Sequence, residues 1–598
     1  MTTTRRNLFK FAGGAAVGVV MTPVPWRLLT DTALLSETWP GVPVPRRGEV
    51  TFRFGNCGLC AAGCAVRARC IAGQPVSLAG VAGHPLSHGA LCAFGIAGHH
   101  LPYHPARLKS GPAAEATAAV RSALGQLRES ERCAVLDLRP GRTASWTYRR
   151  AMASIRNGMY LAPPEPAAVN LAAANTVLSL GAPLFDGWGT PGNVIAARNH
   201  FRLIQAEPVE SRTAVMADLW LQIRPGSEED LALGLAHVLL GEPNVFAAAD
   251  ATGLSEAQIV SLARELKDNG PSLVIGETGA AAALNVILGA PGRTLVTRRE
   301  TPVPDDWKKA APVADLASVP DRSLRVLLID ESAPGEYLPW SRIQPKLARN
   351  AVVVTFAWSK EGYGRQAAFA LPTAVYPEIV DDIPPAVDSP VAAFRLSAAL
   401  VSPPDGMVNP AEFIAGLAGI DAKDALQERA AAIQKSGRGS LFIPSTATST
   451  PVRDVKPAEF RKLLQAGATW IDDPNANLPA PKLAIPALPS DTPDSAFPLA
   501  VAVSEPGTPT LVSPLLSKVY QESNLRLAPE SVALHPSDAH QCGLANGSRA
   551  RLETGAGSAA IEVTVDSTVP PGIVQISGGP GIRKICGAAF VRARVVQS

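Results

Sequence analysis

The chain has 598 residues, enough for several domains, and 46% of them are apolar against 18% charged, which predicts large buried cores. The net charge of +3 and the aromatic content of 5% are too low to indicate a nucleic-acid-binding protein. The 54 prolines and 50 glycines predict many turns and Pro-rich connections.

The N-terminal region, residues 1–40, is predicted to be an export signal and linker. Residues 4–10 (Thr-Arg-Arg-Asn-Leu-Phe-Lys) fit the twin-arginine pattern, and residues 11–21 are mildly apolar. This apolar stretch is too short for a bilayer, which needs about 20 residues. We expect export to the periplasmic side and association with a membrane, with the signal either cleaved or kept as an anchor. The alternative is a chance Arg-Arg pair before a short core helix.

Five of the eight cysteines lie within residues 57–92, and four of them are spaced as one candidate ligand set. Cys57, Cys60 and Cys64 share one short stretch, and Cys92 follows after 27 intervening residues. Four converging thiolates suit a [4Fe–4S] cluster or a tetrahedral zinc ion. Zinc sites usually contain a second Cys or His pair, which is missing here, so the spacing favours the cluster. Two disulfides are a further alternative for an exported protein.

The segment around these cysteines, residues 41–110, is predicted to be a small β-rich domain. Residues 49–54 alternate as in a strand, and residues 66–70 and 75–78 form a predicted hairpin around Ala72 and Gly73. Cys70 then lies on a strand of the hairpin, and we expect it to stay outside the ligand set.

From residue 112 the pattern changes to alternating helices and strands, which predicts doubly wound parallel sheets. The expected helices are residues 113–128, 145–156, 228–240 and 254–267. The expected strands are residues 133–138, 176–180, 201–206, 220–223, 272–276, 294–298, 324–330 and 351–356.

The C-terminal part changes character twice. Residues 441–497 are rich in Pro, Ser, Thr and Ala, which predicts a linker or an extended surface segment. In residues 498–598, short β-patterned runs at 549–553, 559–565 and 573–577 are separated by glycine turns. This pattern predicts a β-barrel.

Several sequence blocks together resemble the molybdopterin oxidoreductase family, the relatives of formate dehydrogenase and dimethyl sulfoxide reductase. They are Gly83-His84-Pro85 and Gly89-Ala90-Leu91-Cys92 after the cysteine loop, residues 207–226, residues 370–372 with Glu378, and residues 534–539 with Gly543, Asn546-Gly547 and Pro571-Gly572. The resemblance implies two interleaved α/β domains, the first from residues 111–165 and 322–440 and the second from residues 166–321. It also implies that the barrel covers the cleft of the pterin cofactor.

In this family, residues matching the 207–226 block contact a molybdopterin guanine dinucleotide. The matching positions here are Glu207, Pro208, Pro225, Gly226 and Glu228. Both acids differ from the family pattern, because Glu228 stands where the guanine-contacting residue is usually Asp and Glu207 is the acid on the ribose side.

Two further departures bear on catalysis. The family usually carries a Lys two residues after the fourth cysteine, where this chain has Phe94, which cannot donate a hydrogen bond. No convincing molybdenum ligand is present: Cys133 is expected to be a core thiol, Ser145 a helix N-cap and Asp186 a loop residue. We therefore assign no catalytic residue.

The remaining candidates are weaker. Five histidines could bind haem or a metal, but we expect them to cover the surface of the cluster domain or its docking face: His84, His88, His99, His100 and His104. Four arginines flank the cysteines and could offset the charge of a cluster or be solvated: Arg53, Arg67, Arg69 and Arg107. Cys70, Cys542 and Cys586 are expected to be unpaired buried thiols.

Residues 39–50, ahead of the cysteines, are also similar to the molybdopterin-like subunits of menaquinone reductases and related quinone-linked respiratory complexes. This resemblance implies an electron-transfer subunit without molybdenum. Its implied partners are a ferredoxin-like iron–sulfur subunit, a multihaem cytochrome c and an integral membrane quinone-binding subunit. The alternatives are a catalytic molybdenum enzyme with a bis-pterin cofactor, and a homologue without either cofactor that acts only in assembly.

Overall fold

The structure is a computed structural model of the chain. It describes residues 48–104, 106–242, 245–276, 279–333, 338, 340–359, 362–474, 478–481, 496–505, 530–555, 557–577 and 591–597. The expected export signal and Cys586 lie outside these residues. Within them, no helix is both long enough and apolar enough to cross a membrane.

The cysteine segment forms an antiparallel sheet of three strands, β1 (Val50–Asn56), β2 (Ala65–Ile71) and β3 (Gln74–Gly80). The turn between β2 and β3 has φ values of +49° at Ala72 and +80° at Gly73. Two successive residues with positive φ form the kind of turn whose twist matches a two-residue hairpin. The predicted hairpin is therefore confirmed.

The first parallel sheet has six strands in the order β12-β5-β4-β13-β14-β15. Its strands are β4 (Arg132–Asp137), β5 (Gly158–Leu161), β12 (Val313–Ala314), β13 (Leu324–Asp330), β14 (Leu347–Ala357) and β15 (Phe369–Pro372). Helices α4 (Ala113–Gly125), α5 (Thr143–Ser154) and α13 (Pro410–Leu417) pack against one face, and α12 (Trp340–Ile343) packs against the other. Because both faces are covered, the successive residues 133–137 of β4 are all buried.

The second parallel sheet has four strands in the order β10-β7-β8-β9. They are β7 (Thr176–Leu180), β8 (Arg202–Glu207), β9 (Leu219–Gln222) and β10 (Ser272–Ile275). Helices α8 (Glu228–Leu240), α10 (Glu256–Asp268) and α11 (Gly279–Ile287) share a core on one face, and α6 (Pro191–Ala197) packs on the other. The strand expected at residues 294–298 is shorter, β11 (Leu295–Val296), and pairs with β6 (Ala168–Val169) in a separate antiparallel ribbon.

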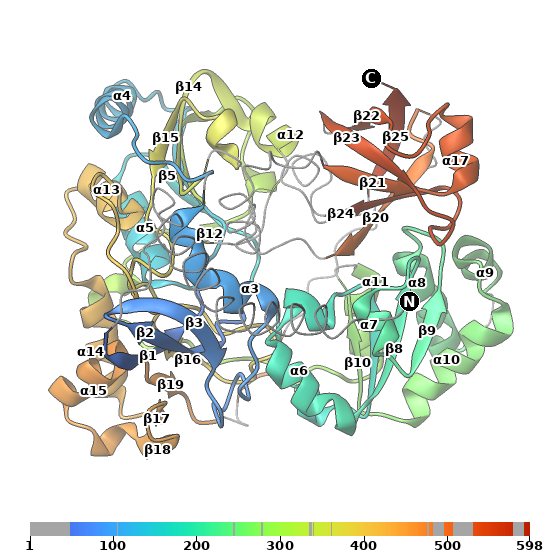
Figure 1. Ribbon diagram of the computed structural model, residues 1–598, viewed down its shortest axis with the longest axis horizontal. Coiled ribbons are helices and arrows are strands. Elements are labelled where there is room, and N and C mark those ends of the chain that lie inside the picture. The colour runs from blue at the N-terminus through green and yellow to red at the C-terminus, as the bar shows by residue number, and fades with distance from the viewer. Residues whose placement is uncertain are drawn as a thin grey trace, which may run out of the picture.

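The two parallel sheets are interleaved in the chain, because all strands of the second lie between β5 and β12 of the first. Figure 1 shows the first sheet at the upper left and the second at the lower right. The expected mixed α/β architecture is confirmed. The residue limits given above for the domains stay predictions, and β12 falls inside the expected second domain although it pairs with the first sheet.

The linker prediction for residues 441–497 is wrong over residues 441–471. This stretch completes a four-stranded antiparallel sheet, β16-β19-β17-β18, with β16 (Ala393–Arg395), β17 (Ser440–Ile443), β18 (Thr448–Pro451) and β19 (Thr469–Ile471). Helices α14 (Ala425–Ser436) and α15 (Pro457–Gln465) cover it around buried Phe460 and Trp470. The prolines that suggested a linker end β18 and begin α15, where neither a strand nor a helix needs their missing N–H.

The C-terminal strands close into the predicted barrel, in the order β20-β24-β21-β23-β22-β25. They are β20 (Leu499–Glu505), β21 (Ser531–Leu534), β22 (Arg549–Thr554), β23 (Gly557–Val565), β24 (Ile573–Ser577) and β25 (Arg592–Gln597). The barrel lies above the second parallel sheet in Figure 1. Val209, just after β8, packs against Ala502, Val569 and Ile573 of the barrel.

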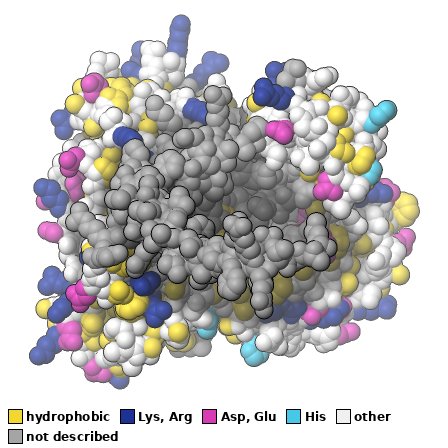
Figure 2. Space-filling view, in the orientation of Figure 1, with side chains coloured by type: hydrophobic (Ala, Val, Ile, Leu, Met, Phe, Trp, Pro, Cys, Tyr) yellow, Lys and Arg dark blue, Asp and Glu magenta, His cyan; other side chains and the backbone are white. Residues whose placement is uncertain are grey.

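Charged side chains are scattered rather than gathered on the face shown in Figure 2. Basic and acidic groups alternate along its visible rim, in keeping with the small net charge of +3. This face therefore presents no broad basic surface among the residues that are coloured there.

Candidate functional site

The first three cysteines lie in the loop between β1 and β2. The backbone N–H of Cys57 donates to the carbonyl of Cys64 at 2.8 Å, which closes the loop. Inside it, the N–H of Gly63 donates to the carbonyl of Cys60 at 3.3 Å. Gly63 has a φ of +52°, a conformation that glycine adopts without strain. The three cysteines are thus held in one closed turn.

Cys92 reaches this loop from the start of α3 (Ala93–Ile96). Its Sγ atom caps the helix by accepting a hydrogen bond from the N–H of Gly95 at 3.4 Å. Gly95 in turn lies against the loop, since a Cβ at this position would be only 3.7 Å from Cys57 Sγ. The cap therefore brings the fourth cysteine beside the first.

The four thiols act on one another electrostatically. Burial raises the pKa of Cys57, and the nearby Cys60 and Cys92 raise it further. Burial also raises the pKa of Cys60, with Cys92 as the next cause. The pKa of Cys64 lies well above its usual value because of burial and of the adjacent Cys60 and Cys57. The loop and the α3 cap thus gather the four predicted ligands around one point.

Cys70 has a different environment. It is buried in β2, with its Sγ 4.0 Å from the carbonyl oxygen of Ala68. Burial raises its pKa, and the charge that opposes this shift is that of Arg53. Cys70 thus packs as a core thiol within the β1–β3 sheet.

The spacing of the sulfurs bears on which metal group could fit. In the described part of the chain, no three His, Cys, Asp or Glu side chains have the geometry of a site for a single metal ion. Four thiolates on one zinc ion lie about 3.8 Å apart, given Zn–S bonds of about 2.3 Å. A [4Fe–4S] cluster requires a wider spacing, because each cysteine binds a different iron. The ligand set and the choice of a cluster over a single ion stay predictions.

Two buried arginines from distant parts of the chain hold the cysteine loop. Arg139, just after β4, donates from Nη1 to the carbonyl of Gly58 at 3.1 Å and from Nη2 to that of Cys60 at 2.8 Å. Arg395, in β16, donates from Nη2 to the carbonyl of Ala61 at 3.1 Å. The loop is therefore anchored both to the first parallel sheet and to the antiparallel sheet.

Tyr376 is wedged between the loop and the segment after α3. A Cβ on Gly58 would lie 2.5 Å from Tyr376 Cβ, and one on Gly98 would lie 2.1 Å from the Tyr376 hydroxyl. Both positions therefore require glycine. Burial raises the pKa of Tyr376 well above its usual value, and the adjacent Cys57 adds to the shift.

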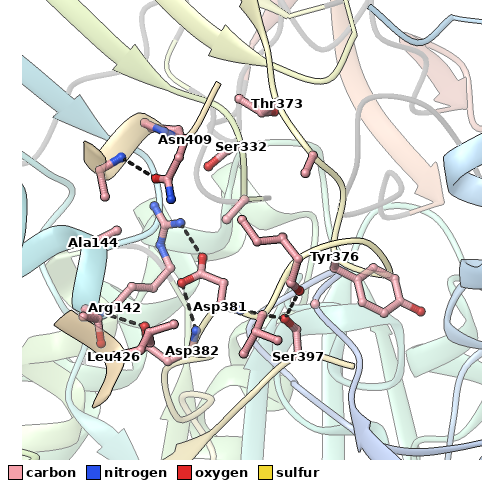
Figure 3. Close-up of a pocket in the computed structure, with 18 of the residues that line it drawn as sticks. Arg142, Ala144, Ser332, Thr373, Tyr376, Asp381, Asp382, Ser397, Asn409 and Leu426 are labelled. Atoms are coloured by element: carbon pink, nitrogen blue, oxygen red, sulfur yellow. Dashed lines mark hydrogen bonds and ion pairs between the residues drawn. The ribbon is translucent and has the colours of Figure 1, made fainter. Parts of the chain in front are cut away.

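A cavity of about 130 Å³ lies between the cysteine loop and the carboxyl edge of the first sheet. Gly58, Leu59 and Tyr376 line it on the loop side, and Arg142 and Asp381 face it from the sheet side (Figure 3). The carboxyl ends of parallel strands are the usual place for a ligand in such folds.

The sheet side of this cavity is a buried charge network. Asp137 and Asp330 end the neighbouring strands β4 and β13 in register, and both are fully buried. Arg142 Nη2 lies 3.2 Å from Asp137 Oδ1 and 2.5 Å from Asp330 Oδ2, while Nη1 lies 3.1 Å from Asp381 Oδ2. The Tyr148 hydroxyl also donates to Asp330 at 2.7 Å. One cation thus ties three carboxylates together.

The network shifts the pKa values of its carboxyl groups in opposite directions. Burial alone would raise the pKa of Asp330, but Arg142 and the hydrogen-bond donors around it hold this pKa below its usual value. Burial and the neighbouring Asp382 raise the pKa of Asp381 to about 6, although Arg142 opposes the shift. Arg429 pairs with Asp382 at 2.8 Å.

The predicted pterin-dinucleotide contacts gather at the carboxyl edge of the second sheet. Glu207 ends β8; its Oε1 accepts from the N–H of Ser211 at 2.9 Å and its Oε2 from Gln205 Nε2 at 2.8 Å. Glu228 begins α8, and burial together with Glu207 raises its pKa. Gly181, after β7, lies opposite, since a Cβ there would be 4.0 Å from Glu228 Oε1.

Pro208, Pro225 and Gly226 occupy the two loops at this edge. Pro208 directly follows β8, and its carbonyl accepts from Gln222 Nε2 at 3.3 Å. Gly226 has a φ of +77° and lets the chain turn from β9 into α8. These three residues and the two acids thus share one edge of the sheet, and their role in binding a nucleotide stays a prediction.

Several other sequence-based assignments are corrected. Ser145 is the third residue of α5 and not its N-cap; the helix begins two residues earlier because Arg142, held by the aspartates, is the cap residue. Asp186 lies in one π-helical turn rather than in a loop. Cys133 is fully buried in β4, as expected for a core thiol, whereas Cys542 is only half-buried. Phe94 is half-buried beside the cysteine core.

The histidines do not form a common surface. His84 is buried: its Nδ1 accepts from the N–H of Ser87 at 3.2 Å, and its Nε2 lies 3.2 Å from Thr469 Oγ1. Burial lowers the pKa of His84 to about 3 and that of the buried His104 to about 4. His99 and His100 stack with ring centroids 4.0 Å apart and are half-buried. Only His88 is exposed, as expected of all five.

The arginines near the cysteines in sequence are not the ones that contact the loop. Arg53, Arg67 and Arg69 are exposed, and Arg107 is paired with Glu378. The sequence reasoning missed Arg139, Arg142 and Arg395, together with Asp137, Asp330 and Tyr376. One signal was available: Arg-Pro-Gly-Arg at residues 139–142 directly follows a buried strand, at the edge where parallel sheets place functional side chains.

Comparisons with known proteins support the family resemblance. The family described as Molydopterin dinucleotide binding domain matches residues 517–590. The menaquinone reductase molybdopterin-binding-like subunit of Nitratidesulfovibrio vulgaris (strain Hildenborough) is 28% identical over 466 residues, which cover 64% of this chain and 67% of that protein. Acetylene hydratase from Pelobacter acetylenicus has the same fold, with a TM-score of 0.67 at 14% identity over 91% of this chain and 100% of that one. The predicted resemblance to molybdopterin oxidoreductases is therefore confirmed.

Proposed function

We propose that this chain is an exported iron–sulfur electron-transfer subunit of a membrane-bound, quinone-linked respiratory complex, and that it works without molybdenum. The observation that carries the proposal is the convergence of Cys57, Cys60, Cys64 and Cys92, which the closed loop and the α3 cap bring together. These four residues would hold one [4Fe–4S] cluster, which supplies one-electron transfer when it is bound.

The surrounding residues suit a site that passes electrons and binds no substrate at the metal. Cys57 and Cys64 are only 5% and 4% exposed, so water is largely kept away from them. The N–H of Gly95 donates to Cys92 Sγ, a contact of the kind that tunes the potential of a cluster. The chain's own task is then to fix the position and electrostatic surroundings of the four sulfurs.

The partners are proposed from the similarity to the menaquinone reductase subunit. We propose a ferredoxin-like iron–sulfur subunit and a multihaem cytochrome c as neighbours in the electron path, and an integral membrane subunit that binds the quinone. The twin-arginine pattern at residues 4–10 supports export to the periplasmic side, where such an assembly would form.

The second candidate function is a molybdenum enzyme with a pterin guanine dinucleotide. It is favoured by the family match at residues 517–590 and by the gathering of Glu207, Pro208, Pro225, Gly226 and Glu228 at one sheet edge. Against it stands the state of the acids, because burial favours the neutral form of Glu228 and both oxygens of Glu207 already accept hydrogen bonds from the chain.

Metal analysis of the full chain, purified without oxygen from its native membrane complex, tests the proposal. We expect about four irons and four acid-labile sulfides per chain, as the cluster formula requires. Molybdenum and tungsten should both be far below one atom per chain. Molybdenum or tungsten close to one per chain would instead establish the second candidate function. Absence of both iron and visible absorbance would leave only a role in assembly.

A further inference from the structure

Two buried arginines beside the cysteine loop lack the carboxylate partners that the other buried arginines have. Among the described residues, five arginine side chains are buried: Arg107, Arg139, Arg142, Arg395 and Arg429. Arg107 pairs with Glu378, Arg142 with three aspartates and Arg429 with Asp382. Within the same residues, neither Arg139 nor Arg395 forms an ion pair.

Their hydrogen bonds do not use all of their donors. Both guanidinium groups donate to neutral carbonyls of the cysteine loop, and Arg395 Nη2 donates also to the carbonyl of Pro384 at 3.1 Å. Arg139 Nε and Arg395 Nε and Nη1 have no partner in the described part of the chain. Asp388 acts on Arg395 only from beyond ion-pair distance, and it already accepts from Thr190 and Asn193.

The guanidinium of Arg395 lies directly against the loop. A Cβ on Gly63 would be 2.5 Å from its Cζ, so only glycine leaves room for the contact. Arg139 Nη2 in turn donates to the backbone carbonyl of Cys60, one of the four predicted ligands, at 2.8 Å. The two cations therefore face the place where the four sulfurs meet.

Leaving a buried charge unpaired destabilises a folded protein, because the charge loses its hydration without gaining a partner. Arg395 is 0% and Arg139 6% exposed, so solvent does little to relieve this cost. A negatively charged group beside them would relieve it. Four thiolates around an iron–sulfur cluster are such a group, since the cluster with its ligands carries net negative charge.

We infer that Arg139 and Arg395 are positioning cations for the cluster, which balance its negative charge and raise its reduction potential. This inference rests on the proposed function. Reduction adds one electron and one negative charge to the cluster, with no bond formed or broken and no proton taken up. Nearby positive charge stabilises the reduced form more than the oxidised form, and therefore favours reduction. The two arginines would supply the cation that is missing at Phe94.

The test is an electron-paramagnetic-resonance redox titration of the full chain at pH 7, with iron content measured on every sample. Arg139→Met and Arg395→Met remove one charge each with similar chain length. In each, we expect the equilibrium between reduced and oxidised cluster to shift at least tenfold toward oxidised, which equals about 59 mV for one electron. Arg139→Lys and Arg395→Lys keep a cation and should restore most of the potential.

Arg67→Met is the matched control, because it removes an exposed arginine of the same domain. Its potential should match that of the native chain. Equal potentials in Arg395→Met, Arg139→Met and Arg67→Met would overturn the inference while leaving the cluster itself intact. If the methionine variants lose iron, retention by the lysine variants supports the charge role, and loss in all four overturns it. Absence of iron in the native chain would refute the proposed function instead.

Discussion

The carboxyl edges of the two parallel sheets both carry acidic side chains, but these acids differ in whether a cation of the described residues pairs with them. At the first edge, Asp137 and Asp330 share the cation Arg142, and the hydroxyl of Tyr148 also donates to Asp330. At the second edge, neither Glu207 nor Glu228 forms an ion pair with a cation of the described residues. Burial and mutual repulsion instead raise the pKa of Glu228.

The difference shows how one architecture can serve two purposes. At the first edge, Arg142 pairs with the buried aspartates. This network fixes the segment at residues 139–142, and through it the cysteine loop. We interpret the first edge as support for the cysteines, whereas a nucleotide-binding role of the second edge stays a prediction.

The largest effect should come from Arg142→Met at the first edge. It leaves three carboxylates without their common cation, and breaking a buried pair in this way costs about 3–5 kcal/mol. Urea unfolding should show a loss of this size. The control is Arg202→Met, which breaks an exposed pair with Glu265 and should cost less than about 1 kcal/mol. Equal losses in the two variants would mean that the network adds no stability beyond a surface pair.

Asp330→Asn should have the next largest effect. The amide keeps the shape but loses the charge that accepts from Arg142 and Tyr148, and hydrogen bonds to charged groups contribute about 1.5–3 kcal/mol. We expect a loss in that range by urea unfolding at pH 7. No loss would show that Asp137 and Asp381 suffice to hold Arg142.

Asp381→Asn tests the raised pKa of Asp381 through the pH dependence of stability. The folded pKa of Asp381 is about 6, above the usual value of about 3.9 for an unfolded chain. Between these values the folded chain holds the extra proton, so the free energy of unfolding falls as pH rises, by at most about 1.4 kcal/mol per pH unit. The variant should lose this part of the slope between pH 4 and 6. An unchanged slope would contradict the assignment.

Glu228→Gln should have the smallest effect. Since no cation of the described residues pairs with Glu228 and burial opposes its charge, an amide of the same shape should change the free energy of unfolding by less than about 0.5 kcal/mol. A loss above about 1 kcal/mol, comparable with that of Asp330→Asn, would remove the distinction between the two edges.

Local sequence patterns predicted much of this molecule. Cys57, Cys60 and Cys64 share a loop by their spacing alone, and buried runs such as residues 133–138 show where strands lie. Short β-runs between glycines likewise indicated the C-terminal barrel, because their alternation sets the strand period. The interleaving of the sheets came from the family resemblance, since alternation alone does not say which strands pair.

Interactions between distant segments could not be predicted in this way. The linker prediction for residues 441–471 is wrong because Phe460 and Trp470 pack in one core with β16, α14 and β17, and local composition does not reveal these partners. Arg395 contacts a loop that lies 334 residues away in the chain. Arg53 and Arg67 lie close to the cysteines in sequence, yet their side chains are exposed.

The most direct measurement is iron and acid-labile sulfide content, with the visible spectrum, of anaerobically prepared alanine variants. Each of Cys57→Ala, Cys60→Ala, Cys64→Ala and Cys92→Ala should lose or strongly deplete the cluster. Cys70→Ala should keep about four irons per chain, because its thiol packs in the β1–β3 sheet. Loss of the cluster in Cys70→Ala together with its retention in Cys92→Ala would contradict the ligand set and the function built on it.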